Sequence, residues 1–152
     1  MSNNSKAAER VVSYIDGFNL YFGLRDAGLE CFKWLNIKDL SSGLLKEHQP
    51  LLETKYFTSK VSKPADKVDR QSAYLGALRT IPGLSIYYGK YEKDKSVRCG
   101  YCGEETMHTQ EKMTDVNIAV SMLEDAYNDA FDTALLISGD SDLSMVLPSW
   151  RD

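Results

Sequence analysis

Acidic turns follow two apolar segments that lie far apart in this chain. Residues 11–15 lead into an Asp-Gly-Phe-Asn turn that begins at Asp16, and residues 134–137 lead into a Ser-Gly-Asp-Ser-Asp turn that begins at Ser138. Buried strands of an open α/β sheet bring the residues at their carboxyl ends to one edge, where such folds bind ligands. Carboxylates gathered at one edge repel each other unless a cation lies among them. The pattern therefore favours a metal-dependent enzyme that acts on phosphates.

Apolar runs alternate with helical patterns along the chain, which predicts a parallel sheet with helices on both of its faces. We expect residues 1–10 to be a flexible N-terminus and residues 11–152 to form a single domain, with a cysteine-containing insertion at about 92–110. A sheet of this kind usually continues beyond the second acidic turn, so we expect the C-terminal part to be incomplete or completed by a partner chain. The expected strands are 11–16, 52–58, 84–91 and 133–138, and the expected helices are 19–27, 36–46, 65–80 and 115–128.

The composition is that of a soluble globular protein, with 152 residues, 43% apolar residues and 26% charged residues. No apolar run is long enough to cross a membrane, and the polar start does not resemble a signal peptide. Three cysteines are an odd number, which favours a reducing compartment over a disulfide framework. We therefore expect a cytoplasmic protein without a membrane partner. The sequence leaves the oligomeric state open, a homo-oligomer included.

Positive charge is concentrated in the middle of the chain. Residues 55–98 contain ten Lys or Arg and four Asp or Glu, although the whole chain has a net charge of −4. A basic segment beside an acidic remainder suits a phosphate-binding surface that borders a metal site. A solvated surface of mixed charge explains the same composition.

Three motifs, in this order, resemble those of the NYN domains, a branch of the PIN-like nucleases. They are Tyr14–Asn19, Glu111–Val116 and Ser138–Asp142, and the similarity in order and spacing extends from about residue 11 to residue 147. The resemblance implies an α/β fold, a PIN-like three-layer α/β/α sandwich with a mainly parallel central sheet. It also implies a bound Mg²⁺ or Mn²⁺ and the hydrolysis of phosphodiester bonds, most often in single-stranded or structured RNA.

The resemblance gives the acidic residues a catalytic role. The cation would help a water molecule to lose its proton and to attack the phosphorus. Asp16 and the second turn would supply ligands from strand ends, and Asp115 would supply one from the start of a helix. The expected catalytic and metal-binding residues are Asp16, Asp115, Asp140 and Asp142.

Polar and basic residues near the acids are expected to bind the substrate. The Asn19 amide could hold a water or a phosphate oxygen, and lysines of the basic segment favour phosphate. The expected substrate-binding residues are Asn19, Lys112, Ser138, Ser141, Lys60 and Lys63. Tyr87, Tyr88 and Tyr91 could stack on bases, although at least half of them are expected to pack beneath helices. Phe18 and Tyr21 are expected in the core and its rim, and not as platforms for bases.

Each acidic motif has an ordinary structural explanation when it is taken alone. Asp16 could belong to a simple turn, Asp115 could cap a helix, and residues 139–142 could form a loop. Many NYN relatives carry a further acid near the position of Ser121, which leaves open whether a second ion binds. The alternative is a catalytically weak or inactive nucleic-acid-binding or regulatory module of the same fold. A phosphatase or nucleotide hydrolase is a third interpretation.

Cys99 and Cys102 have the spacing of half a zinc knuckle. A structural zinc site needs four ligands, and a second Cys-x-x-Cys pair is absent from the sequence. His108 is the first candidate for a third ligand, and Cys31 or His48 could complete the set through the fold. The other interpretation is a reduced, exposed pair of thiols on a flexible loop.

Overall fold

A computed structural model describes residues 7–91, 95–98, 101–103, 105–108, 111–112, 114–140 and 143 of the chain. Its central sheet has four parallel strands in the order β3-β2-β1-β8. These strands are β1 (Val11–Asp16), β2 (Leu51–Thr58), β3 (Leu84–Tyr88) and β8 (Thr133–Ile137).

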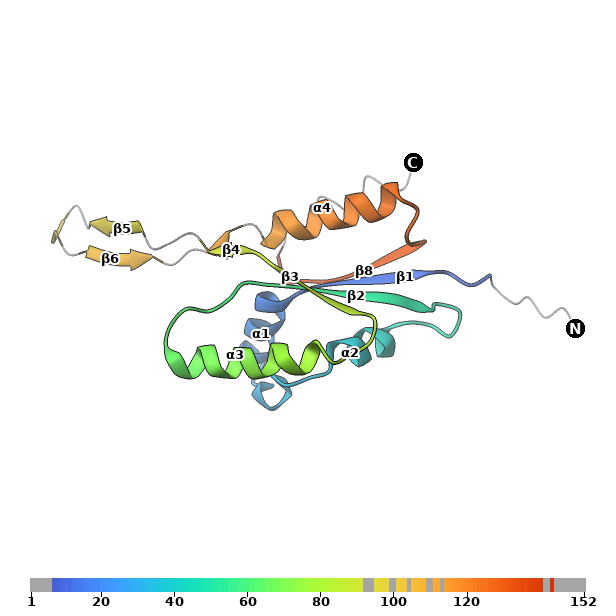
Figure 1. Ribbon diagram of the computed structural model, residues 1–152, viewed down its shortest axis with the longest axis horizontal. Coiled ribbons are helices and arrows are strands. Elements are labelled where there is room, and N and C mark those ends of the chain that lie inside the picture. The colour runs from blue at the N-terminus through green and yellow to red at the C-terminus, as the bar shows by residue number, and fades with distance from the viewer. Residues whose placement is uncertain are drawn as a thin grey trace, which may run out of the picture.

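Helices cover both faces of this sheet (Figure 1). One helix, α4 (Thr114–Tyr127), lies on one face. The other face carries α1 (Gly17–Asp26), α2 (Ile37–Leu44) and α3 (Ala65–Leu78), and a short helix, η1 (Glu30–Phe32), follows α1. The predicted α/β fold with a parallel sheet is therefore confirmed.

The β1 strand lies at the centre of the sheet, and all six of its residues are buried. The chain moves outward from β1 to β2 and β3 and then returns to place β8 on the other side of β1. The carboxyl ends of β1 and β8 thus flank the point where the strand order reverses. In open α/β sheets, the crevice at such a point is the usual place for a ligand.

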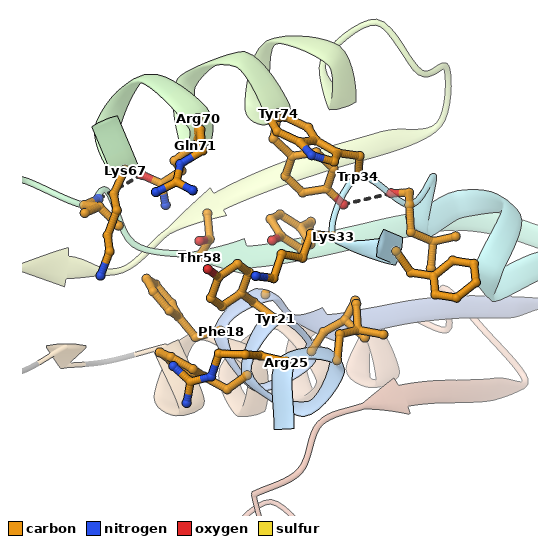
Figure 2. A pocket seen from close by; sticks show the side chains of 18 of the residues that line it. Phe18, Tyr21, Arg25, Lys33, Trp34, Thr58, Lys67, Arg70, Gln71 and Tyr74 are labelled. Carbon is orange, nitrogen blue, oxygen red and sulfur yellow. Dashed lines mark hydrogen bonds between the residues drawn. The ribbon is translucent and has the colours of Figure 1, made fainter. Parts of the chain in front are cut away.

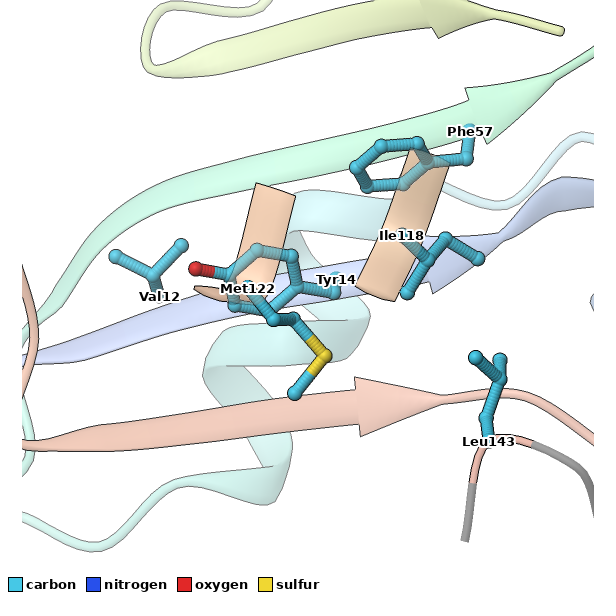
Figure 3. Close-up of a cluster of buried hydrophobic side chains, with 6 residues drawn as sticks. All are labelled: Val12, Tyr14, Phe57, Ile118, Met122 and Leu143. Carbon is cyan, nitrogen blue, oxygen red and sulfur yellow. The ribbon is translucent and has the colours of Figure 1, made fainter. Parts of the chain in front are cut away.

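Each face of the sheet has its own hydrophobic core. On the α4 face, Tyr14 and Phe57 from the sheet pack with Ile118 and Met122 of the helix (Figure 3). The opposite core contains Ile15 and Tyr56 from the sheet together with residues from α2 and α3. Adjacent strand residues point to opposite faces, so β1 and β2 contribute to both cores.

The predicted elements agree with the structure to within a few residues at most ends. The first helix begins at Gly17 instead of Asn19, because the Asp16 side chain caps it directly after the strand. The strand expected over residues 84–91 is divided. Its first part, β3, ends at Tyr88, and Lys90–Tyr91 forms a separate strand, β4.

Two antiparallel ladders, one at the base of the insertion and one within it, were not predicted. The β4 strand pairs with β7 (Glu111–Lys112), and β5 (Lys95–Arg98) pairs with β6 (Glu105–His108). These short strands are rich in charged and polar residues, so they lack the apolar alternation that marks a half-buried strand. Figure 1 shows both ladders beyond the carboxyl edge of the parallel sheet.

Among the described residues, no helix combines the length and the apolar character that crossing a membrane would require.

A buried ion pair joins the sheet to α4. Lys55 of β2 is 7% exposed, and its Nζ lies 2.6 Å from Oδ2 of Asp125. The Tyr14 hydroxyl donates a hydrogen bond of 2.5 Å to the same oxygen, and burial and this bond to Asp125 raise the pKa of Tyr14. Burial alone would lower the pKa of Lys55, but the bond to Asp125 and the charges around it raise the pKa above its ordinary value. Lys55 is therefore charged at neutral pH.

Replacing Asp125 by Ala should destabilise the fold by about 3–5 kcal/mol, because the change leaves the Lys55 ammonium buried without its partner. Urea unfolding followed by circular dichroism measures this loss. The matched control is Asp66→Ala, which removes the exposed Asp66–Arg70 pair on α3 and should cost less than about 1 kcal/mol. Equal losses in the two variants would contradict the structural role given to the buried pair.

Candidate functional site

Asp16 ends β1 and caps α1, and it is only 3% exposed. Its Oδ1 accepts a hydrogen bond of 3.0 Å from the backbone N–H of Asn19, and its Oδ2 accepts one of 2.6 Å from the Asn19 side-chain amide. Among the described residues, no Lys or Arg forms an ion pair with Asp16. A carboxylate has about four lone-pair directions, so these two bonds leave it able to accept further ligands.

The second acidic turn lies directly beside this cap. The parallel pairing of β1 with β8 sets Ile15 opposite Ile137, so both strands end at the same level. A Cβ on Gly139 would lie 3.2 Å from Oδ1 of Asn19. Gly139 is therefore in close contact with Asn19, whose amides are bonded to Asp16. The structure thus brings the Asp16 motif and the second acidic turn together.

The remaining predicted acids are placed less closely. Asp115 lies in the first turn of α4 and is exposed, and Figure 1 shows that α4 starts at the end of the sheet where β1 finishes. In the second turn, Ser138 and Asp140 are partly buried, and the Asp140 N–H donates to Ser138 Oγ at 3.1 Å. Ser141 and Asp142 lie outside the described residues.

The donor set at this edge has the chemistry of a hard-cation site. Carboxylate and amide oxygens suit Mg²⁺ or Mn²⁺, and Mg²⁺ is often held by one or two carboxylates while waters and substrate phosphates complete its shell. Within the part of the chain that the structure describes, no three His, Cys, Asp or Glu side chains form a metal-binding group. Asp16 and Asp140 could supply two carboxylate ligands to a cation that keeps several of its waters.

The position of Ser121 has a structural explanation. Ser121 is buried, and Lys55 Nζ lies 3.4 Å from its Oγ. Asp125, one helical turn further along α4, is the acid that approaches the sheet, and Lys55 neutralises it. The Asp125 carboxylate therefore helps to hold α4 on the sheet.

The predicted zinc ligands are spread over the insertion. Cys102 is exposed, Cys99 lies outside the described residues, and His108 pairs with Lys95 in the β5–β6 ladder. His108 lies three residues along β6 from Glu105, which is about 10 Å at the usual strand rise. The register therefore holds His108 away from the turn that carries Cys102. Cys31 is exposed in η1, and Nε2 of His48 lies 3.5 Å from Oε2 of Glu9.

A pocket of about 320 Å³ opens beside the carboxyl ends of β1 and β2, between α1 and α3 (Figure 2). Lys63 lines this pocket, whereas Lys60 is exposed nearby with its Nζ 5.2 Å from the centre of the Tyr88 ring. Phe18 is half-buried and Tyr21 is exposed, and both line the pocket. Their spacing with Arg25 places all three on one side of α1, which is a signal that the sequence contained. Lys112 lies in β7, and its side chain is not among the described parts of the structure.

Comparison with known proteins identifies a family and one relative. The family model described as NYN domain matches residues 10–152. A curated protein from Pseudomonas putida (strain DSM 28022 / S16), named 6-hydroxy-3-succinoylpyridine 3-monooxygenase HspA, is 29% identical over 175 residues. The match covers 91% of this chain and 54% of the relative, so the chain spans about half the length of that protein. No solved structure matches.

The capping role of Asp16 can be separated from its charge. We expect Asp16→Ala to cost about 1–2 kcal/mol of stability, because the cap of α1 is lost, whereas Asp16→Asn should retain most of that stability. In the second variant the Asn19 amide can turn to present its oxygen. Urea unfolding in the presence of EDTA measures both effects without any contribution from a cation. Equal destabilisation by the two substitutions would show that the negative charge itself is required for the cap.

Proposed function

Since this chain belongs to the NYN domain family, we propose that it is a metal-dependent nuclease that hydrolyses phosphodiester bonds, with RNA as its substrate. The observation that carries the proposal is the buried Asp16 carboxylate at the reversal point of the sheet, with the second acidic turn in contact with its partner Asn19. A PIN-like nuclease fold and a set of oxygen donors at its ligand-binding edge together support this chemistry.

The residues of this edge have distinct parts in the proposed reaction. A divalent cation bound here would polarise a phosphate oxygen and lower the pKa of the attacking water. Asp16 and Asp140 would hold that cation, with Asp142 and Asp115 as further ligands. Asn19 holds the Asp16 carboxylate in place through two hydrogen bonds, so that the carboxylate does not rotate when the substrate binds. Ser138, Ser141 and Lys112 would contact the phosphate.

A nucleic-acid-binding module without turnover is the alternative within the same family. In that case RNA should bind in the presence of EDTA, and no product should form when Mg²⁺ or Mn²⁺ is added. The alternative and the nuclease therefore differ in a single experiment on the same protein.

A second candidate is the recognition of a small aromatic acid. The name of the Pseudomonas putida relative refers to a hydroxylated succinoylpyridine, which combines an aromatic ring with a carboxylate. The pocket beside the sheet edge is lined by aromatic and cationic side chains, and this specific observation favours the second candidate. Binding of 6-hydroxy-3-succinoylpyridine itself tests it.

Replacing Asp140 by Asn should abolish cleavage of end-labelled single-stranded RNA in Mg²⁺ or Mn²⁺. Changes that only orient a metal ligand cost about 10- to 100-fold in activity, so loss of a direct ligand should exceed about 100-fold. Gel electrophoresis of the products over time gives the rate.

The matched control is Asp129→Asn, the same isosteric change at an exposed residue that precedes β8 at the opposite end of the sheet. Asp129 has a φ of 53°, a conformation that Asn also tolerates. The control should cut RNA at the wild-type rate. If Asp140→Asn cuts as fast as the wild type, the activity comes from a contaminant and the nuclease assignment is wrong.

A structural zinc ion in the insertion is a separate proposal. Protein purified without chelators should contain about one zinc per chain by elemental analysis, because two thiolates at this spacing can share a metal. Cys99→Ser should lose the zinc, and Cys31→Ser, at an exposed cysteine of η1, should retain it. Wild-type protein without zinc would exclude the site.

A further inference from the structure

The pocket between α1 and α3 has two aromatic walls. On α1, the Phe22 ring packs against Phe18 and Tyr21, with ring centres 6.1 Å and 5.4 Å apart. On the other side, Tyr74 of α3 contacts Trp34 and Tyr56 edge to face, at 5.9 Å and 6.3 Å. Figure 2 shows the α1 side chains facing those of α3 and of the segment that carries Trp34. These walls suit a flat ring.

The charged residues that line the pocket are all positive. They are Arg25, Lys33, Lys63, Lys67 and Arg70, and none of the Asp or Glu residues that the structure describes lines it. Burial raises the pKa of Tyr74 to about 12, so its hydroxyl stays neutral and donates to the Leu35 carbonyl at 2.9 Å. The pocket therefore carries a concentrated positive charge at neutral pH, which favours an anion.

Acidic partners offset only some of these cations. Arg25, Lys33 and Arg70 pair with Asp26, Glu30 and Asp66, which lie outside the pocket lining. Within the described part of the chain, Lys63 and Lys67 form no ion pair. Both are exposed, with Lys63 just before α3 and Lys67 in its first turn, so their charges are free to meet an incoming phosphate.

The pocket also adjoins the acidic edge. Gly17 and Thr58 line it, and Gly17 directly follows Asp16 in the chain. A Cβ at Gly17 would lie 2.5 Å from the Tyr56 ring, so a glycine is required for α1 to pass this close to β2. A ligand in the pocket would consequently lie next to the carboxylates that the nuclease proposal uses.

We propose that this pocket binds one nucleotide of the RNA strand, with the base against the aromatic walls and the phosphate at Lys63 and Lys67. The inference rests on the proposed function and extends it to the recognition of single-stranded substrate. Lys63 and Lys67 are the two lining cations without a described ion pair, and a volume of about 320 Å³ holds a base together with its sugar. A phosphodiester anion beside a planar base matches both features of the pocket.

Direct binding of a mononucleotide tests the proposal. The chain contains two tryptophans, Trp34 and Trp150, so a full-length Trp150→Phe protein reports on the pocket through Trp34 fluorescence. Uridine and adenosine 5′-monophosphate are titrated in EDTA at low salt, next to uridine, ribose 5-phosphate and 6-hydroxy-3-succinoylpyridine. The nucleotides should bind at least about tenfold more tightly than the nucleoside or the sugar phosphate, because only they contact both the aromatic walls and the lysines Lys63 and Lys67.

Two substitutions assign the contacts. Lys67→Gln and Tyr21→Leu should each weaken nucleotide binding about tenfold, because they remove a phosphate partner and a stacking surface. Lys46→Gln, at an exposed lysine outside the pocket, should leave the affinity unchanged. Tyr21 is 40% exposed, so its replacement should leave the thermal unfolding temperature near that of the parent protein.

Three results would overturn the proposal. They are equal affinity for the nucleotide and for ribose 5-phosphate, affinities that neither Lys67→Gln nor Tyr21→Leu changes, and tighter binding of 6-hydroxy-3-succinoylpyridine than of any nucleotide. The last result would assign the pocket to the small aromatic acid. Because the titration contains EDTA, it is independent of cleavage. Nucleotide binding without RNA hydrolysis would reject the nuclease and keep the pocket, and hydrolysis without pocket-dependent binding would do the reverse.

Discussion

The two hydrogen bonds from Asn19 to Asp16 determine how the chain leaves the central strand, and the rest of the candidate site depends on them. They cap α1 immediately after β1, while Gly17 lets the helix pass close to the Tyr56 ring. With 3.6 residues per turn, a helix that starts there presents Phe18, Tyr21 and Arg25 on one side. Asn19 contacts Gly139 instead. One helix thus contributes to both the acidic edge and the aromatic pocket.

The buried Asp16 and the half-buried Asp125 differ in what neutralises them. Asp125 receives the Lys55 ammonium and the Tyr14 hydroxyl, so its charge is balanced within the protein. Asp16 receives two neutral amide donors, and none of the described cations pairs with it. A buried carboxylate is costly unless it is paired or well hydrogen bonded, and amide donors offset only part of that cost. Asp16 is therefore the carboxylate with a remaining preference for a cation.

The sequence predicted the parallel sheet because β1 and β8 are mainly apolar runs that end in turns, and a pattern of this kind is a local property. It also placed Asp16 and the second turn at one edge, since parallel strands end together. The Lys55–Asp125 pair could not be found this way, because its partners are 70 residues apart and meet only through packing. The charged β5–β6 ladder lacks an apolar pattern, so no strand was predicted within the insertion. The aromatic pocket could not be predicted from the sequence, since Trp34 and Tyr74 are far apart along the chain and approach each other only in the fold.

The pocket beside α1 is lined by basic residues, whereas Asp16 and Asp140 lie at the sheet edge near the start of the same helix, so a nucleic acid strand would meet both charges. Lysines around the pocket attract phosphates at any metal concentration, with a strength that falls as salt rises. Carboxylates at the neighbouring edge repel the same strand until a divalent cation neutralises them. On the proposed function, one nucleotide can enter the pocket without metal, but the phosphodiester bond beside it can reach Asp16 only when a cation is present. The ion would then contribute to docking of the strand as well as to the hydrolysis itself, because the protein supplies no positive charge to Asp16 within the part described.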